Sequence, residues 1–243
     1  MGAAMGAPLR WGLCALKGGC GRSSVAWLLA TEGTQRGLKV LCVDADPQAS
    51  LRTATDIALQ AGRPAPTTIA LTGETLHHPS QLPRISTGYD LVLVDGVPRM
   101  SEVLRSILMF VDVAIVPSSG APTETWAAGQ AVDLIRQAQG VRPSLKCALL
   151  LNKIQPNTGI GRAARSALET TGMPVLRTVL AWRVAFQEVM ASGQGICDYA
   201  PSSPADLEVR KLFAELLALS RGENLEPKTA RHQPASGASA SGA

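Results

Sequence analysis

The sequence of 243 residues lacks most features that mark a secreted, membrane-spanning or metal-holding protein. Its five cysteines form no CxxC pair and show no His/Cys spacing of a metal site. Three of them stand in apolar, strand-like runs, which favours a reduced compartment. No run approaches the roughly 20 apolar residues of a membrane-spanning helix, and the start MGAAMGAPLR has no long apolar core. We therefore expect a cytoplasmic protein with no membrane partner.

A strong charge of one sign is also missing. The formal net charge is only +4, from 23 basic and 19 acidic residues. Between residues 160 and 221, seven basic residues stand against six acidic ones, which is no basic stripe. The composition therefore does not establish a nucleic-acid partner, but it is compatible with weak, salt-sensitive attraction to phosphate.

What the chain does have is a series of short apolar, β-branched runs that alternate with helical patterns. The predicted strands are 11–16, 39–44, 89–95, 112–117, 145–152 and 175–180. The alternation predicts an α/β fold, with a mostly parallel sheet and helices on both faces.

Helices are expected at 23–35, 123–139 and 162–171, each followed by a glycine that suits a helix C-terminus: Gly37, Gly140 and Gly172. A last amphipathic helix is expected at 204–219, with Ser203 as its N-cap. Its apolar stripe consists of Leu207, Leu212, Leu216 and Leu219.

The length and the 46% hydrophobic content suit one large domain. We place it at residues 10–220, after a flexible N-terminus at 1–9. Residues 221–243 contain one large apolar residue, Leu225, and we predict a disordered tail because such a segment cannot bury enough surface to become ordered.

A glycine-rich segment, LKGGCGRSS at residues 16–24, follows the first predicted strand and opens the first predicted helix. Gly18, Gly19 and Gly21 let the backbone curl so that its N–H groups face an anion. Ser23 stands where a hydroxyl group would bind Mg²⁺. An ordinary glycine-rich turn between a strand and a helix is the alternative.

Carboxylates end two further predicted strands. VDADPQASL places Asp44 and Asp46 after the second strand, and LVLVDGVP ends the third with Asp95, as in a Walker B sequence. A single aspartate at a strand end is commonly a turn or N-cap residue. Because the carboxyl ends of parallel strands bind ligands, the order and spacing of these groups predict one phosphate and Mg²⁺ site.

These segments together resemble the ParA/MinD family of deviant Walker A ATPases, and most of all ParA-type partition and positioning proteins. The matching segments are KGGCGRSS, DADPQ at 44–48, VDGVP, VDVAIVPSS at 111–119, LLLNK at 149–153 and RVAFQEVMASGQGICDYAP at 183–201. The resemblance covers residues 10–220. It implies the P-loop NTPase fold of the deviant Walker A type, with ATP and Mg²⁺ as ligands.

The resemblance also implies roles for single residues. Lys17 would reach the partner's nucleotide across an ATP-dependent homodimer, and Asp46 would orient the attacking water. Asp44 would support catalysis and the water shell of the metal, with Ser23 and Asp95 at the metal itself. The implied nucleotide-binding residues are Gly18, Gly19, Cys20, Gly21, Arg22, Ser23, Ser24 at the α-phosphate, and Asn152 at the adenine edge, although an asparagine at a strand end is also a common turn residue.

The segment departs from the GxxxxGK[ST] pattern at two positions. Leu16 stands at the first glycine position, and Arg22 stands where the family has lysine. Arginine keeps the charge but brings a planar, bulkier group. Either it contacts phosphate with two N–H groups and slows hydrolysis, or it crowds the loop and weakens binding. We expect slow hydrolysis, because phosphoryl transfer depends on positioning and electrostatics. Harmless variation at Arg22 is the remaining alternative.

The resemblance implies a bacterial, cytoplasmic and nucleoid-associated ATPase that turns ATP into ADP and phosphate. Such a switch would partition or position a plasmid, a chromosome or other cargo through nonspecific DNA binding, with an adaptor or centromere-binding protein as partner. One alternative is a nucleotide-binding scaffold with little or no ATPase activity, recruiting a partner in DNA transfer or an envelope machine. Another is a reductase or metal carrier of the nitrogenase iron-protein branch, for which Cys147 and Cys197 offer no convincing cluster pair.

Overall fold

The computed structural model describes residues 7–71, 73–97, 102–155 and 158–223. Most of the N-terminus 1–9 and of the tail 221–243, which the sequence predicts to be flexible and disordered, lies outside the described residues. Leu9 already belongs to the first strand, and the last helix ends at Ser220.

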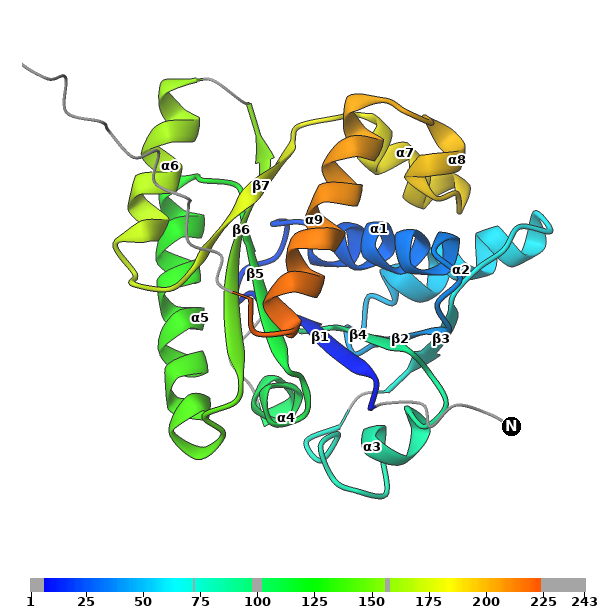
Figure 1. Cartoon of the computed structure of the whole chain (residues 1–243), viewed down its shortest axis with the longest axis horizontal. Helices are drawn as coiled ribbons and strands as arrows, with labels where there is room; N and C mark the ends of the chain where they lie inside the picture. The colour runs from blue at the N-terminus through cyan, green and yellow to red at the C-terminus, as the bar shows by residue number, and fades with distance from the viewer. Residues whose placement is uncertain (1–6, 72, 98–101, 156–157, 224–243) are drawn as a thin grey trace, which may run out of the picture.

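Within the described residues, one sheet of seven parallel strands forms the centre of the molecule, in the order β3-β2-β4-β1-β5-β6-β7 (Figure 1). The strands are β1 (Leu9–Leu13), β2 (Val40–Asp44), β3 (Thr67–Ala70), β4 (Leu91–Asp95), β5 (Val113–Ser118), β6 (Lys146–Ile154) and β7 (Val175–Ala181). β2 and β4 are buried along their whole length, which explains their continuous apolar sequences.

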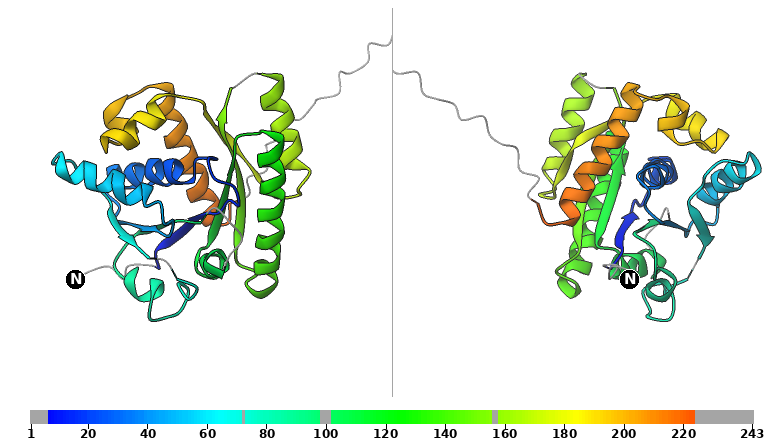
Figure 2. Two further views of the ribbon diagram at one scale, coloured as in Figure 1. Left: turned by 180° about the vertical axis from the view of Figure 1, so that it is seen from behind. Right: turned by 45° about the vertical axis from the view of Figure 1, so that its right-hand side comes forward.

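Helices cover both faces of the sheet (Figures 1 and 2). They are α1 (Arg22–Gln35), α2 (Ser50–Gln60), α3 (Leu82–Ile85), α4 (Glu102–Phe110), α5 (Pro122–Val141), α6 (Gly159–Glu169), α7 (Ala185–Ser192), α8 (Ile196–Tyr199) and α9 (Pro204–Ser220). Buried side chains of α1, α2, α7, α8 and α9 form one core with the sheet. Those of α3, α4, α5 and α6 form the other. The predicted α/β fold is confirmed.

The six predicted strands all exist, with ends that differ by at most three residues. β3 was not predicted from the sequence, because its residues TTIA form no apolar run; the strand lies at the sheet edge and has no buried residue. Gly37 follows α1 with φ +78°, as expected for a helix C-terminus. Gly140 does not end its helix, since α5 continues to Val141.

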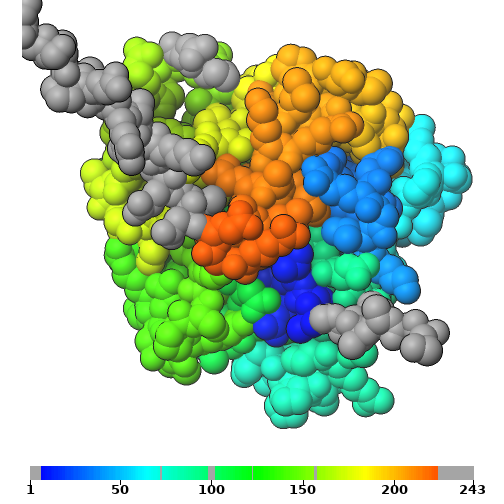
Figure 3. All heavy atoms as spheres, viewed as in Figure 1, coloured from blue at the N-terminus to red at the C-terminus, as the bar shows by residue number. Residues whose placement is uncertain are grey.

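The C-terminal helix α9 packs against β7 and α1, and in the view of Figure 3 its C-terminal end lies beside the dark-blue segment of β1. Ser203 caps it as predicted, accepting a hydrogen bond from the backbone N–H of Asp206 at 3.2 Å. Leu212 and Leu216 are fully buried, but the predicted stripe is wrong at Leu207, which is 48% exposed. Val209 and Phe213, on the same buried face, complete the packing.

The topology places several loops at one edge of the sheet. The chain leaves β1 toward β2 on one side, whereas the chain that leaves β4 crosses to β5 on the other side of β1. Ligands of open α/β sheets bind outside the carboxyl ends of the strands where such a reversal occurs. Asp95 pairs in register with both Leu13 and Asp44, so the ends of β1, β2 and β4 lie next to each other.

In the described part of the chain, no helix is long and apolar enough to cross a membrane.

Candidate nucleotide-binding site

The glycine-rich loop joins β1 to α1 and ends in a left-handed residue. Gly21 precedes the first turn of α1 with φ +90°, and Gly19 has φ +85°. No described residue accepts a hydrogen bond from the backbone N–H groups of residues 18–21. No side chain caps the start of α1 either. The loop therefore presents free N–H donors at the positive end of a helix, which is a favourable place for an anion.

Arg22 is buried under this loop, with 6% of its surface exposed. Its Nη1 donates to the carbonyl oxygens of Lys17 at 2.8 Å and Ala15 at 3.1 Å. Its Nε donates to the carbonyl of Gly96 at 3.1 Å, and Nη2 donates to Asp46 Oδ2 at 3.2 Å. These contacts use four of the five N–H donors of a guanidinium group. The arginine thus links the ends of β1, β2 and β4.

The two carboxylates after β2 have different partners. Asp46, which is 9% exposed, also accepts a hydrogen bond from the backbone N–H of Gln48 at 3.0 Å. Asp44 accepts from the backbone N–H groups of Leu51 at 3.1 Å and Arg52 at 3.0 Å, and so satisfies the first turn of α2. Burial raises the pKa of Asp44, while these N–H donors lower it. Its predicted catalytic and metal roles stay predictions beside this observed capping role.

Asp95 has no exposed surface, and neither of its carboxylate oxygens has a hydrogen-bond partner among the described residues. Burial raises the pKa of Asp95 to about 7, against lowering effects from the Ser23 hydroxyl and the Arg22 charge. The hydroxyl of Ser23 lies close enough to act on this pKa, but it forms no hydrogen bond of ordinary geometry with Asp95. A buried carboxylate without partners is costly unless a ligand completes it.

Lys17 lies on the outer side of the loop. Its Nζ donates to the hydroxyl of Thr123 at the start of α5, at a distance of 2.7 Å. The ammonium group is therefore held at the molecular surface, and it is not directed at the loop of its own chain. This position is compatible with a contact to a second subunit, which stays a prediction.

Asn152 and Lys153 approach the loop from the end of β6. Asn152 Nδ2 donates to the carbonyl of Cys20 at 2.8 Å, and Lys153 Nζ donates to the carbonyl of Gly19 at 2.6 Å. The sequence resemblance implies that Asn152 contacts the adenine edge, and this role stays a prediction. No role was predicted for Lys153, although the residue stands in the quoted LLLNK segment. The sequence signal that could have identified Lys153 is its position directly after a strand-end asparagine.

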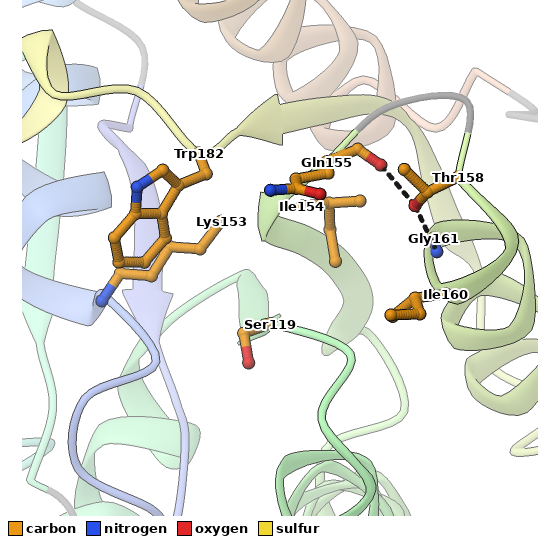
Figure 4. Close-up of a pocket in the computed structure, with 8 residues that line it drawn as sticks. All are labelled: Ser119, Lys153, Ile154, Gln155, Thr158, Ile160, Gly161 and Trp182. Carbon is orange, nitrogen blue, oxygen red and sulfur yellow. Dashed lines mark hydrogen bonds between the residues drawn. The ribbon is translucent and has the colours of Figure 1, made fainter.

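A hollow of about 420 Å³ lies beside the loop, at the ends of β5, β6 and β7 (Figure 4). It is lined by Ser119, Lys153, Ile154, Gln155, Thr158, Ile160, Gly161 and Trp182. Lys153 extends alongside the ring of Trp182, with its Nζ 5.8 Å from the ring centre. Ser24 faces a smaller hollow that it shares with Asn152 and Trp182. A planar group could therefore enter next to the loop.

The fold and this site define a phosphate-binding α/β protein of the P-loop class. The description "CbiA: CobQ/CobB/MinD/ParA nucleotide binding domain" matches residues 11–196. The chain belongs to this nucleotide-binding family.

Two relatives and one solved structure show the extent of the similarity. The maintenance of carboxysome distribution protein A of Halothiobacillus neapolitanus is 31% identical over 206 residues, covering 83% of this chain and 93% of the relative. The chromosome-partitioning ATPase Soj of Thermus thermophilus is 27% identical over 233 residues, covering 83% of this chain and 92% of the relative. The septum site-determining protein MinD of Pyrococcus horikoshii, complexed with Mg-ADP, superposes with a TM-score of 0.70 at 18% identity, covering 88% and 97%.

Proposed function

We propose that the protein is an ATP-dependent dimerising switch that partitions or positions a large cargo in the cell. The observation that carries this proposal is the combination of the free N–H groups of the loop with the buried, unpartnered carboxylate of Asp95. Free N–H groups suit phosphate, and the unpartnered carboxylate suits a hydrated cation. The names of the relatives, which refer to carboxysome distribution and chromosome partitioning, support a role in positioning.

The residues of the site fit Mg²⁺ together with a nucleotide. Ser23 and Asp95 would hold the metal, because no described residue forms a hydrogen bond with the Asp95 oxygens, whereas those of Asp44 accept backbone hydrogen bonds. Bound Mg²⁺ neutralises negative charge on the phosphate oxygens. The loop N–H groups orient the phosphates, and Asp46 orients the attacking water. The hollow beside Trp182 receives the base and ribose.

Hydrolysis is slow in this proposal because the carboxylate of Asp46 is already paired with the guanidinium of Arg22. A carboxylate that already accepts from a guanidinium at 3.2 Å has less freedom to hold a water and its proton. The same contact favours the second candidate, a nucleotide-binding scaffold that hydrolyses little or no ATP and recruits a partner in DNA transfer or an envelope machine.

Binding of nonspecific DNA and of an adaptor or centromere-binding protein is the finer part of the proposal. It rests on the relatives and on the small positive net charge of +4. DNA affinity should require ATP, because two copies present twice the positive charge of one, and it should fall steeply with salt.

Calorimetric titration with Mg-ATP, and nonspecific duplex DNA binding in the presence of ATP or ADP, test the proposal. We expect Mg²⁺-dependent ATP binding, and DNA binding with ATP only. ATP binding without any DNA binding or turnover would favour the scaffold. No binding of Mg-ATP at millimolar concentration would contradict both candidates.

A further inference from the structure

Two consecutive side chains at the end of β6 hold two consecutive carbonyl groups of the phosphate loop. Lys153 Nζ is 2.6 Å from the carbonyl oxygen of Gly19, and Asn152 Nδ2 is 2.8 Å from that of Cys20. The partners are about 130 residues apart in the sequence, at separations of 134 and 132. The loop is therefore attached to β6, two strands away in the sheet, as well as to its own strand.

The local backbone of β6 is arranged for these contacts. Lys153 has φ +57°, a left-handed conformation that costs a residue with a Cβ atom on the order of 1 kcal/mol. In this conformation the Lys153 N–H donates to Asn152 Oδ1 at 3.0 Å. The amide oxygen of Asn152 is thereby occupied, and its Nδ2 faces the loop. Such strain at a site persists only where the surrounding contacts maintain it.

Gly21 shows how closely the loop lies on this pair. A Cβ atom at Gly21 would stand 2.4 Å from Asn152 Nδ2 and 3.4 Å from Lys153 Cε. Gly21 also has φ +90°, which residues with a side chain rarely adopt. Both constraints require glycine here, so the close approach of the loop to β6 is built into the sequence.

Because the peptide group is planar and trans, these two carbonyl contacts also fix the direction of the N–H groups that follow them. In each peptide unit the C=O of one residue and the N–H of the next point in opposite directions. Because the Gly19 and Cys20 carbonyls face β6, the N–H groups of Cys20 and Gly21 face the opposite side. Neither of these N–H groups donates to a described residue.

We propose that Asn152 and Lys153 are positioning residues that aim the N–H groups of Cys20 and Gly21 at the phosphates of the nucleotide. This inference rests on the proposed function for its ligand. It gives Asn152 a different role from recognition of the adenine edge. The two roles make opposite predictions for a ligand that has phosphates but no base.

Binding of Mg-ATP, Mg-GTP and inorganic tripolyphosphate with Mg²⁺ should be measured for the parent, Asn152→Asp, Lys153→Met and Lys153→Arg. Asparagine and aspartate have similar shape, but aspartate cannot donate to Cys20. We expect each of Asn152→Asp and Lys153→Met to weaken all three ligands roughly tenfold, because each loses one polar contact to the loop. Lys153→Arg should recover most of the affinity. Lys211→Met, on an exposed position of α9, is the matched control and should bind as the parent does.

Unchanged tripolyphosphate binding in Asn152→Asp, together with a lost preference for ATP over GTP, would overturn the positioning role and support base recognition. A parent that binds neither Mg-ATP nor tripolyphosphate would contradict the proposed function itself. Amide hydrogen exchange of the nucleotide-free protein tests the attachment without any ligand. Exchange in a peptide covering residues 16–24 should be faster in Lys153→Met than in the parent or in Lys211→Met, and equal rates in all three would overturn the inference.

Discussion

Arg22 is the residue at which this chain differs most from the pattern it resembles, and its contacts explain the consequence. A lysine ammonium has three donors at one point, so it cannot reach from the Ala15 and Lys17 carbonyls to Asp46 as the guanidinium does. The arginine thus donates to the carbonyl groups of the loop and also to the carboxylate of Asp46. One donor on Nη2 is left over, and we expect it to reach a phosphate.

Replacing Arg22 should separate these two roles. Arg22→Lys should hydrolyse ATP faster than the parent, because Asp46 is released while a positive charge stays under the loop. Arg22→Ala should bind ATP more weakly, by on the order of 2 kcal/mol, because a charge-assisted contact is lost. Steady-state ATPase rates and calorimetric affinities measure both effects. If both variants equal the parent in both measurements, Arg22 does not contact phosphate.

Asp95 makes the stability of the nucleotide-free protein depend on pH. Burial raises the pKa of Asp95 from 3.8 to about 7, so between these values the folded protein keeps a proton that the unfolded chain releases. Its contribution to stability therefore falls as the pH rises through this range, and the full cost is present above pH 7.

Asp95→Asn should remove that cost. In EDTA at pH 8, the variant should unfold at a higher urea concentration than the parent. The expected gain in the free energy of unfolding is up to about 4 kcal/mol. The advantage should be smaller at pH 5 and should vanish toward pH 4. A gain that is equal at pH 5 and pH 8 would show that Asp95 does not titrate in this way. The variant should also lose Mg²⁺-dependent nucleotide binding at either pH.

Some residues of the candidate site could be placed from the sequence alone, and others could not. Glycine at 18, 19 and 21, Ser23, Asp46 and Asp95 were predicted to lie together because loop chemistry and strand ends are local patterns, and they do follow the adjacent ends of β1, β2 and β4. Their roles in binding and catalysis stay predictions. The partners of Arg22, Lys17 and Asn152 could not be assigned. They depend on which loops from distant segments lie together, and that is decided by the order of strands in the sheet.

Among the elements, α9 and β7 show how an exposed sheet edge is closed. Glu215 on α9 accepts hydrogen bonds from the backbone N–H groups of Arg177 at 2.7 Å and Thr178 at 3.0 Å. Glu208 accepts from the N–H of Ala181 at 3.1 Å. These carboxylates satisfy edge donors that could otherwise pair with another chain.

Glu215→Ala should lower the free energy of unfolding by about 2 kcal/mol, because two backbone N–H groups lose their charged acceptor. Glu215→Gln keeps one acceptor oxygen and should lose less. Urea titration at neutral pH measures both variants. A result in which alanine and glutamine behave like the parent would show that water replaces the carboxylate without cost.

The six strands that were predicted from sequence each have a mostly apolar run. The helices α2, α4 and α7 were not predicted, although each has buried apolar side chains. β2 and β4 are buried on both faces and were found within one or two residues. The edge strand β3 and the short helices α3 and α8 have no such pattern. Gly140 was a poor guide because it lies within the long helix α5, which ends one residue later.

At the scale of the whole molecule, Lys17 is the residue that we propose connects the site to a second copy. It lies at the surface, on Thr123, on the outer side of the phosphate loop. Lys17→Ala should bind Mg-ATP with an affinity close to that of the parent, since its ammonium is not directed at the loop of its own chain. The variant should stay monomeric with ATP and should lose turnover. Dimerisation of Lys17→Ala at the parent's level would contradict the role of this lysine across the subunit interface.

The central claim is that ATP joins two copies of this chain. Its most direct test is the molar mass of the parent protein by light scattering during size exclusion, with Mg-ATP, with Mg-ADP and without nucleotide. The account predicts a mass near twice the 25.4 kDa of one chain with Mg-ATP only, and a monomer in the other two conditions. A monomer at saturating Mg-ATP, or a dimer of equal stability without nucleotide, would contradict it.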